Sequence, residues 1–213
     1  MLQHIVLSCF FWALISSAAA QIKPASLRSG DLIFQDLDCG PMCDAIEAVT
    51  EGVNGQKFSH IGLVYGNGDT AKIIEAIGEA VRFTPMATFL QRTDNPMPVA
   101  RLRKRFCRLI PMALKYATSQ IGVPYDDAFL YDNGKYYCSE LIYDAFKAAN
   151  KGKPFFKLFP MTFKQPGGAT FFPVWVAYYR KLGMAIPEGN PGCNPGGLSR
   201  SRKIKILGNV LVE

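Results

Sequence analysis

Histidine is nearly absent from this chain of 213 residues, which contains only His4 and His60. Residues 1–20 also lack Lys, Arg, Asp and Glu, although the whole chain carries a formal net charge of +7. Their apolar run (residues 5–15) is too short to cross a membrane, which takes roughly 20 apolar residues. The run is followed by small residues, and this pattern predicts a signal peptide over residues 1–20, cleaved after Ala20. An uncleaved anchor is the alternative.

Removal of that segment leaves one histidine and five cysteines in residues 21–213, which we predict to form a single periplasmic or secreted domain. Five is an odd number, so in an oxidising compartment one cysteine remains an intermolecular partner or a free thiol. If Cys138 is the free thiol, parity allows the pairs Cys39–Cys43 and Cys107–Cys193, although the sequence does not establish them.

Ligand patterns for metals and nucleic acids are missing as well. The stretch "CGPMC" (residues 39–43) could form a short disulfide or bind a metal, but no second His/Cys pair accompanies it. We therefore expect no metal and no cofactor. The positive charge is concentrated in "RLRKRFCR" (101–108) and "SRSRKIKI" (199–206). These segments indicate a solvated face or an attraction to anionic cell-wall or membrane surfaces, while no motif indicates nucleic-acid binding.

Hydrophobic periodicity predicts an α+β domain without repeats. Strands are expected at residues 30–35, 58–65, 70–77, 80–85, 98–103 and 203–212, and helices at 44–49, 108–122, 139–149 and 173–182. The segment "GNGDTA" (66–71) loosely fits a dinucleotide-binding fingerprint. The segment after it resembles a strand rather than a helix, so we do not favour this interpretation.

Cys138 precedes an apolar stripe at helical spacing, formed by Leu141, Ile142, Ala145, Phe146 and Ala149. The predicted helix therefore begins near Cys138. Unpaired backbone N–H groups and the positive end of the helix dipole favour a thiolate at such a position. An inert buried cysteine is the competing interpretation.

His60 lies on a predicted strand that "NG" (67–68) connects to the next strand as a hairpin. A two-residue turn would place Glu75 directly opposite His60, with Cβ atoms about 4.5–5.5 Å apart. A carboxylate there would orient the imidazole, whereas a longer turn would change the register. An exposed Glu75 is the alternative.

Several motifs together resemble the permuted papain-like amidases of the YiiX/YaeF type, relatives of the NlpC cell-wall peptidases. They extend over nearly the whole mature chain: "GDLIF" (30–34), "FSHIGLVY" (58–65), "IIEAI" (73–77), "RFTPMATFLQR" (82–92), "GVPYDDAF" (122–129), "YYCSELIYDAF" (136–146) and "GNPGCNPGGLSRS" (189–201). The resemblance implies a circularly permuted papain-like fold, with an antiparallel sheet against helices and the nucleophile at a helix N-terminus.

By the same resemblance, Cys138 matches the family's nucleophile, His60 its base and Glu75 its polar third residue, while Tyr137 is a candidate site wall. Cys39 and Cys43 match no family motif. The implied activity is thiol-dependent hydrolysis of amide bonds in peptidoglycan peptides or small amino-acid amides, without a cofactor. Two alternatives stay open. The first is a lipid acyltransferase or thioesterase, with the stretch 155–163 lining an apolar groove, and the second is a non-catalytic binding module of the cell envelope.

Overall fold

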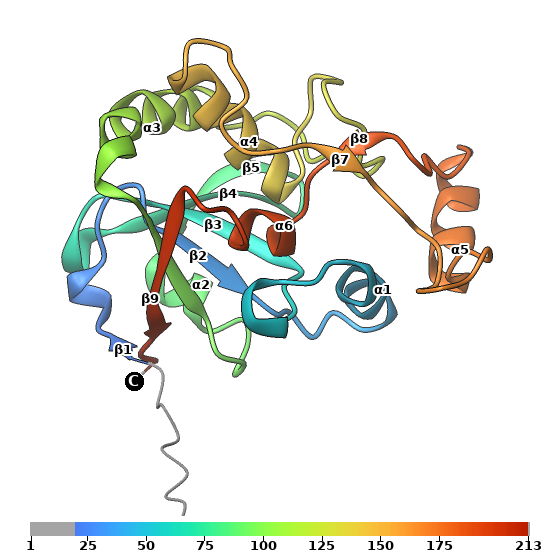
Figure 1. Cartoon of the computed structure of the whole chain (residues 1–213), viewed down its shortest axis with the longest axis horizontal. Helices are drawn as coiled ribbons and strands as arrows, with labels where there is room; N and C mark the ends of the chain where they lie inside the picture. The colour runs from blue at the N-terminus through green and yellow to red at the C-terminus, as the bar shows by residue number, and fades with distance from the viewer. Residues whose placement is uncertain (1–19, 213) are drawn as a thin grey trace, which may run out of the picture.

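A seven-stranded sheet organises the computed structural model of the chain, which describes residues 20–212 (Figure 1). The predicted signal peptide (residues 1–20) lies outside the described residues except for Ala20. The strand order is β1-β9-β6-β2-β3-β4-β5, and every pair is antiparallel except β1–β9. The strands are β1 (Gln21–Ile22), β2 (Leu32–Gln35), β3 (His60–Tyr65), β4 (Lys72–Ile77), β5 (Ala80–Pro85), β6 (Pro98–Leu102) and β9 (Ile204–Val210).

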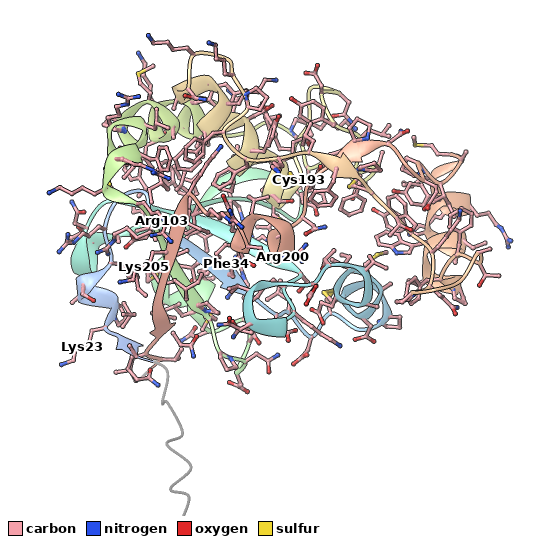
Figure 2. All side chains as sticks on the ribbon, in the orientation of Figure 1. Lys23, Phe34, Arg103, Cys193, Arg200 and Lys205 are labelled. Atoms are coloured by element: carbon pink, nitrogen blue, oxygen red, sulfur yellow. A yellow bond between two sulfur atoms is a disulfide. The ribbon has the colours of Figure 1, made fainter. Side chains whose placement is uncertain are left out.

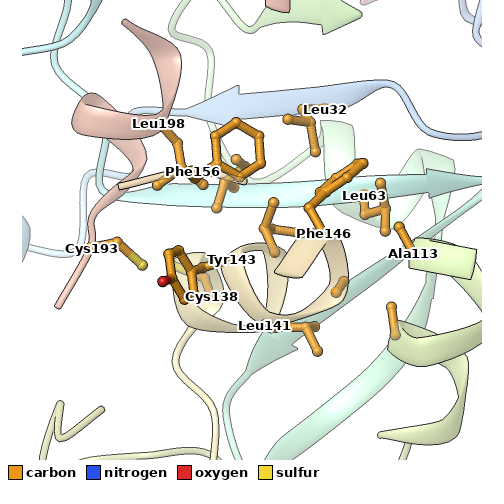
Figure 3. Packing of buried hydrophobic residues seen from close by; sticks show 14 of the residues in the cluster. Leu32, Leu63, Ala113, Cys138, Leu141, Tyr143, Phe146, Phe156, Cys193 and Leu198 are labelled. Atoms are coloured by element: carbon orange, nitrogen blue, oxygen red, sulfur yellow. The ribbon is translucent and has the colours of Figure 1, made fainter. Parts of the chain in front are cut away.

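Alternating side chains divide the apolar core between the two faces of this sheet. On one face, Ile61 and Leu63 pack under α3 (Ile110–Ser119) and α4 (Cys138–Ala149). On the other face, Val64 packs near α2 (Met86–Leu90). Figure 3 shows the first face, with Leu141 and Phe146 of α4 in the core and Cys138 at the start of the helix.

A smaller apolar cluster lies beside the sheet, where α1 (Pro41–Val49) packs against α5 (Pro173–Leu182). Figure 1 shows α5 at the edge of the molecule, where the segment that follows β7 leads. The remaining elements are the strand pair β7 (Phe159–Pro160) and β8 (Pro191–Gly192), α6 (Pro195–Ser199), and the 3₁₀ helices η1 (Pro24–Ser26), η2 (Val53–Gly55), η3 (Gly68–Thr70) and η4 (Lys104–Leu109). Within residues 20–212, no helix is long and apolar enough to cross a membrane.

The predicted α+β class is confirmed, and each predicted strand and helix corresponds to an observed element. The segment 66–71, weighed as a dinucleotide fingerprint, forms a turn with η3 and then enters strand β4. Because no helix follows to supply free N–H groups to a pyrophosphate, the segment is not a dinucleotide-binding loop.

The predicted two-residue hairpin turn is wrong. A turn of that kind on "NG" requires positive φ at both residues, but Asn67 is extended, with φ −136°. The chain instead turns over residues 66–71, with positive φ at Gly66 and Gly68. In the resulting register Leu63 pairs with Ile74. One residue further along, the same register places Glu75 opposite Gly62. Glu75 is therefore a diagonal neighbour of His60 on the same face of the sheet.

One of the two disulfides that parity allowed is present. Cys39 and Cys43 are bonded across the start of α1, while Cys107, Cys138 and Cys193 are free thiols. The Cys107–Cys193 pair is wrong, because both thiols are free in the structure. Cys107 lies in η4, near the carbonyls of Leu102 and Arg103, whereas Cys193 is buried beside Tyr137, next to the start of α4.

Candidate active site

His60 is the first residue of β3, where it pairs with Gln35 of β2. Its side chain is buried, with 4% of the residue exposed, and its ring lies 6.0 Å from the ring of Phe89. The close packing explains the glycine two residues later in the chain. A β-carbon on Gly62 would clash with the side chain of Ile73 and lie 2.8 Å from Phe89, so both the strand neighbour and the ring that packs against the imidazole would have to move.

Glu75 lies on β4 with no exposed surface, and its Oε2 is 2.6 Å from His60 Nε2. Buried carboxylates need partners for their charge, and Glu75 has several. Thr84 of β5 donates its hydroxyl to Oε1, and the Arg92 guanidinium donates to both oxygens at 2.6 and 2.7 Å. This bidentate geometry fixes the plane of the carboxylate in front of the imidazole.

Arg92 and Thr84 are site residues that the sequence patterns did not single out. Arg92 follows α2, and its side chain is 17% exposed and lies over the ring of Phe89. Thr84 is in register with Ile73 and therefore diagonal to Glu75 on the neighbouring strand. A sequence signal existed for both, because they lie within the quoted stretch "RFTPMATFLQR" (82–92). That stretch alone did not indicate which side chains would point at Glu75.

The two buried groups shift each other's protonation toward the charged forms. Burial disfavours the charge on His60, but interactions with the Cys138 thiol and with Glu75 outweigh it and raise the pKa of the imidazole to about 9. Burial likewise opposes ionisation of Glu75, but hydrogen bonds from Arg92, His60 and Thr84 lower its pKa to about 2. At neutral pH the pair is therefore an imidazolium and a carboxylate.

Cys138 is the first residue of α4, a helix of 12 residues. The residue is 6% exposed, and its sulfur lies 3.9 Å from the carbonyl oxygen of Ser59, the residue before His60. Glu75 occupies Nε2 of the imidazole, so Nδ1 is the nitrogen available to the thiol. The backbone N–H of Cys138 is one of the first-turn groups that have no acceptor within the helix, so it can bind a developing oxyanion.

A cavity of about 150 Å³ opens beside Cys138. Tyr137, the candidate wall residue, lines it and is itself buried, with its hydroxyl accepting a bond from the backbone N–H of Cys193. The stretch 155–163 divides into two parts. Phe155 and Phe156 are packed in the core against α4, while Phe159 and Phe163 line the cavity.

The geometry brings a thiol at a helix N-terminus, a buried imidazole and a buried carboxylate together, as in papain-like hydrolases, and a family comparison agrees. The model of the permuted papain-like amidases of the YaeF/YiiX type, family C92, matches residues 26–207. The chain belongs to this family. It is a family of cysteine peptidases and amidases.

Two comparisons with individual proteins place the chain near YiiX of Escherichia coli. The YiiX protein of strain K12 is 25% identical over 132 residues, a match that covers 57% of this chain and only 58% of YiiX. A crystal structure of the metalloprotein YiiX from Escherichia coli O157:H7 superposes with a TM-score of 0.67 at 20% identity. The match covers 85% of this chain and 97% of that one, so the expected permuted papain-like fold is confirmed.

Because that crystal structure is described as a metalloprotein, a metal site in this chain has to be considered. Among residues 20–212, no three His, Cys, Asp or Glu side chains lie close enough together to hold a metal ion. Cys39 and Cys43, which "CGPMC" offered as possible ligands, are joined in a disulfide.

Proposed function

We propose that this amidase acts by thiol acyl transfer, with Cys138 as the nucleophile, His60 as the general base and acid, and Glu75 as the residue that orients the imidazole. One observation carries the proposal. The imidazole is held 2.6 Å from a fully buried carboxylate through Nε2, while its remaining nitrogen is left to the thiol at the start of α4. This is the nucleophile–base–orienter arrangement of covalent hydrolases.

The reaction proceeds through a thioester. In the reactive form the proton of Cys138 is already on Nδ1 of His60, and the sulfur adds to the substrate carbonyl, whose oxygen takes the negative charge and is bound by the N–H of Cys138. When the intermediate collapses, the C–N bond breaks and the imidazolium gives its proton to the leaving amine. Water, deprotonated by the same imidazole, then adds to the thioester and releases the carboxylic acid and the free thiol.

For the substrate, we propose amide bonds in cell-wall peptides or in small amino-acid amides, hydrolysed outside the cytoplasm after export. The family's amidase activity and the predicted signal peptide support this choice. A second candidate is acyl transfer from an ester or a lipid. The apolar cavity next to Cys138 favours it, because Phe159, Met161 and Trp175 could contact a hydrocarbon chain.

An anionic envelope surface is the partner that we propose for the basic side of the molecule. The two basic segments meet there. The backbone N–H of Arg103 donates to the carbonyl oxygen of Lys203, and its Nε–H donates to the carbonyl oxygen of Arg202, both at 2.9 Å. Figure 2 shows Arg103 and Lys205 beside β9. Six exposed cations of these segments form what we call the basic surface: Arg103, Lys104, Arg105, Arg108, Arg202 and Lys205. A seventh exposed cation, Arg200, pairs with Glu51 and is not included. Within residues 20–212, none of the six forms an ion pair.

The catalytic proposal is tested by replacing the thiol. Cys138→Ala should lower the rate of hydrolysis of a panel of amino-acid amides and N-acyl amides by at least about a thousandfold. Cys107→Ala, a free cysteine in η4, is the matched control and should leave the rate unchanged. Intact-protein mass spectrometry after mixing with a p-nitrophenyl ester should show one acyl group, located on Cys138. Full activity in Cys138→Ala, or acylation elsewhere, would refute the proposal.

A further inference from the structure

The cavity beside Cys138 has a chemical character that narrows the substrate. Of the side chains that line it, none carries a charge, and most are aliphatic or aromatic. Its walls come from several separate parts of the chain. Among them, α1 supplies Ile46 and Val49, the segment around β7 supplies Phe159 and Phe163, α5 supplies Trp175, and the start of α4 supplies Cys138. A group that enters the cavity thus meets a mostly apolar wall that includes the thiol.

The side chains that line the cavity pack against one another, so the cavity is formed before a ligand binds. Trp175 packs edge-to-face against Phe163 and Phe129, with ring centroids 5.1 and 5.7 Å apart. The Cys39–Cys43 disulfide ties the start of α1 to the preceding loop. A preformed cavity does not require these side chains to be ordered when the ligand binds, so apolar contacts convert more fully into affinity.

The size of the cavity sets the size of the group. At about 150 Å³ it matches engineered apolar cavities that bind a benzene ring. A carboxylate or ammonium group would lose its hydration here and find no oppositely charged side chain in the lining, so its entry is disfavoured. The residues on both sides of the nucleophile, Tyr137 and Ser139, line the cavity, whereas His60 is absent from the described lining residues. The leaving amine must reach His60, so the cavity lies on the acyl side of the scissile bond.

We propose that this cavity is an acyl subsite, which takes an uncharged apolar group of about six carbon atoms attached to the carbonyl carbon that Cys138 attacks. The inference rests on the proposed function and deepens it. The amide substrate carries a phenyl or short aliphatic group on its acyl side, and the charged side chains of a cell-wall peptide are excluded from this position.

The test uses the thiol itself and does not require turnover. The full-length protein is labelled with N-methyl-, N-butyl- and N-(2-carboxyethyl)-iodoacetamide, and rates at individual cysteines are measured by peptide mass spectrometry. Cys107 is free and partly exposed, so its rate corrects for the intrinsic reactivity of each reagent. Each buried methylene contributes roughly a factor of four. We therefore expect the corrected rate at Cys138 to rise at least about tenfold from N-methyl to N-butyl and to fall for the carboxylate reagent.

A charge placed in the wall should reverse this preference. Val49→Lys puts an ammonium group in the cavity and should make the carboxylate reagent the fastest at Cys138. Val176→Lys is the matched control, since Val176 is 38% exposed and follows Trp175 outside the cavity lining. It should keep the order of the native protein. Equal corrected rates for the three reagents in the native protein, or the same reversal in both variants, would overturn the subsite.

The acyl side is tested with substrates. An apolar group should raise kcat/KM when it is attached to the carbonyl carbon and not when it is attached to the amine, and a gain confined to the amine would overturn the assignment.

Failure of the subsite and failure of the proposed function are distinguishable. If Cys138→Ala abolishes hydrolysis but the reagents show no preference, the subsite alone is wrong. If the preference is present but Cys138→Ala remains active, the catalytic proposal is wrong.

Discussion

Arg92 should control how strongly Glu75 holds the proton on His60. The guanidinium and the imidazole bind the same oxygen of Glu75, at 2.7 and 2.6 Å, so two cations share one carboxylate. Replacement of Arg92 by Gln removes one of them and leaves the Glu75–His60 contact in place. We expect the pKa of His60, about 9 in the native protein, to rise in Arg92→Gln.

The magnitude follows from the separation of the two cations. Two unit charges about 5 Å apart repel by about 3 kcal/mol at an effective dielectric constant near 20. Arg92 is 17% exposed, so water screens part of this repulsion, and roughly half of it remains to act on the imidazolium. At 1.36 kcal/mol for each pH unit, the pKa of His60 should rise by about one. Glu75 also loses its bidentate partner, and we expect the free energy of unfolding to fall by about 2 kcal/mol.

The assay is an NMR titration of the His60 ring, which is simple to assign because His4 is the only other histidine in the chain. Arg82→Gln is the matched control. Arg82 is exposed on β5 and lies in register with Glu75, but it makes no ion pair within the described part of the chain. Replacement of Arg82 should leave the pKa of His60 unchanged. A pKa that stays the same or falls in Arg92→Gln, or rises equally in Arg82→Gln, would refute this account of the site.

Two further predictions concern the thiols and the basic surface. When the protein is denatured without reductant, a thiol reagent should alkylate Cys107, Cys138 and Cys193. Alkylation of Cys39 or Cys43, or a disulfide-linked peptide pair that contains Cys107 and Cys193, would contradict the structure. Arg103→Gln/Lys205→Gln should bind vesicles containing phosphatidylglycerol about 30-fold more weakly than the native protein, at about 1 kcal/mol for each cation. Lys115→Gln/Lys181→Gln removes the same charge from α3 and α5 and should bind like the native protein; equal losses in both double variants would show that only net charge matters.

The secondary structure was predictable because local patterns determined it. β-branched and apolar residues alternate in 58–65, and an apolar stripe at helical spacing follows Cys138, so strand β3 and helix α4 could be placed within a few residues. Pro111 lies in the first turn of α3, where a proline is tolerated because its missing N–H has no partner there. Each of these signals lies within a single element, and tertiary packing did not override any of them.

The environment of the site depended on contacts between distant segments, and for these the sequence contained no comparable signal. Arg92 reaches Glu75 because the loop after α2 returns toward β4, and no spacing rule predicts that return. The apolar cavity likewise combines α1, α5 and the β7 segment around Cys138. The Cys107–Cys193 disulfide rested on parity alone, which counts thiols but contains no information about their distance.

The hairpin shows why a wrong register still identified the partner of His60. The actual pairing differs from the predicted one by two residues, and side chains alternate with a period of two, so Glu75 remains on the face of His60. The change makes the two residues diagonal neighbours, whose Cα atoms lie roughly 7–8 Å apart instead of about 5 Å. An aspartate could reach a directly opposite imidazole. The additional methylene group of glutamate spans the diagonal and still allows the carboxylate to approach Nε2 to 2.6 Å. The longer turn and the choice of glutamate are therefore two parts of one geometric solution.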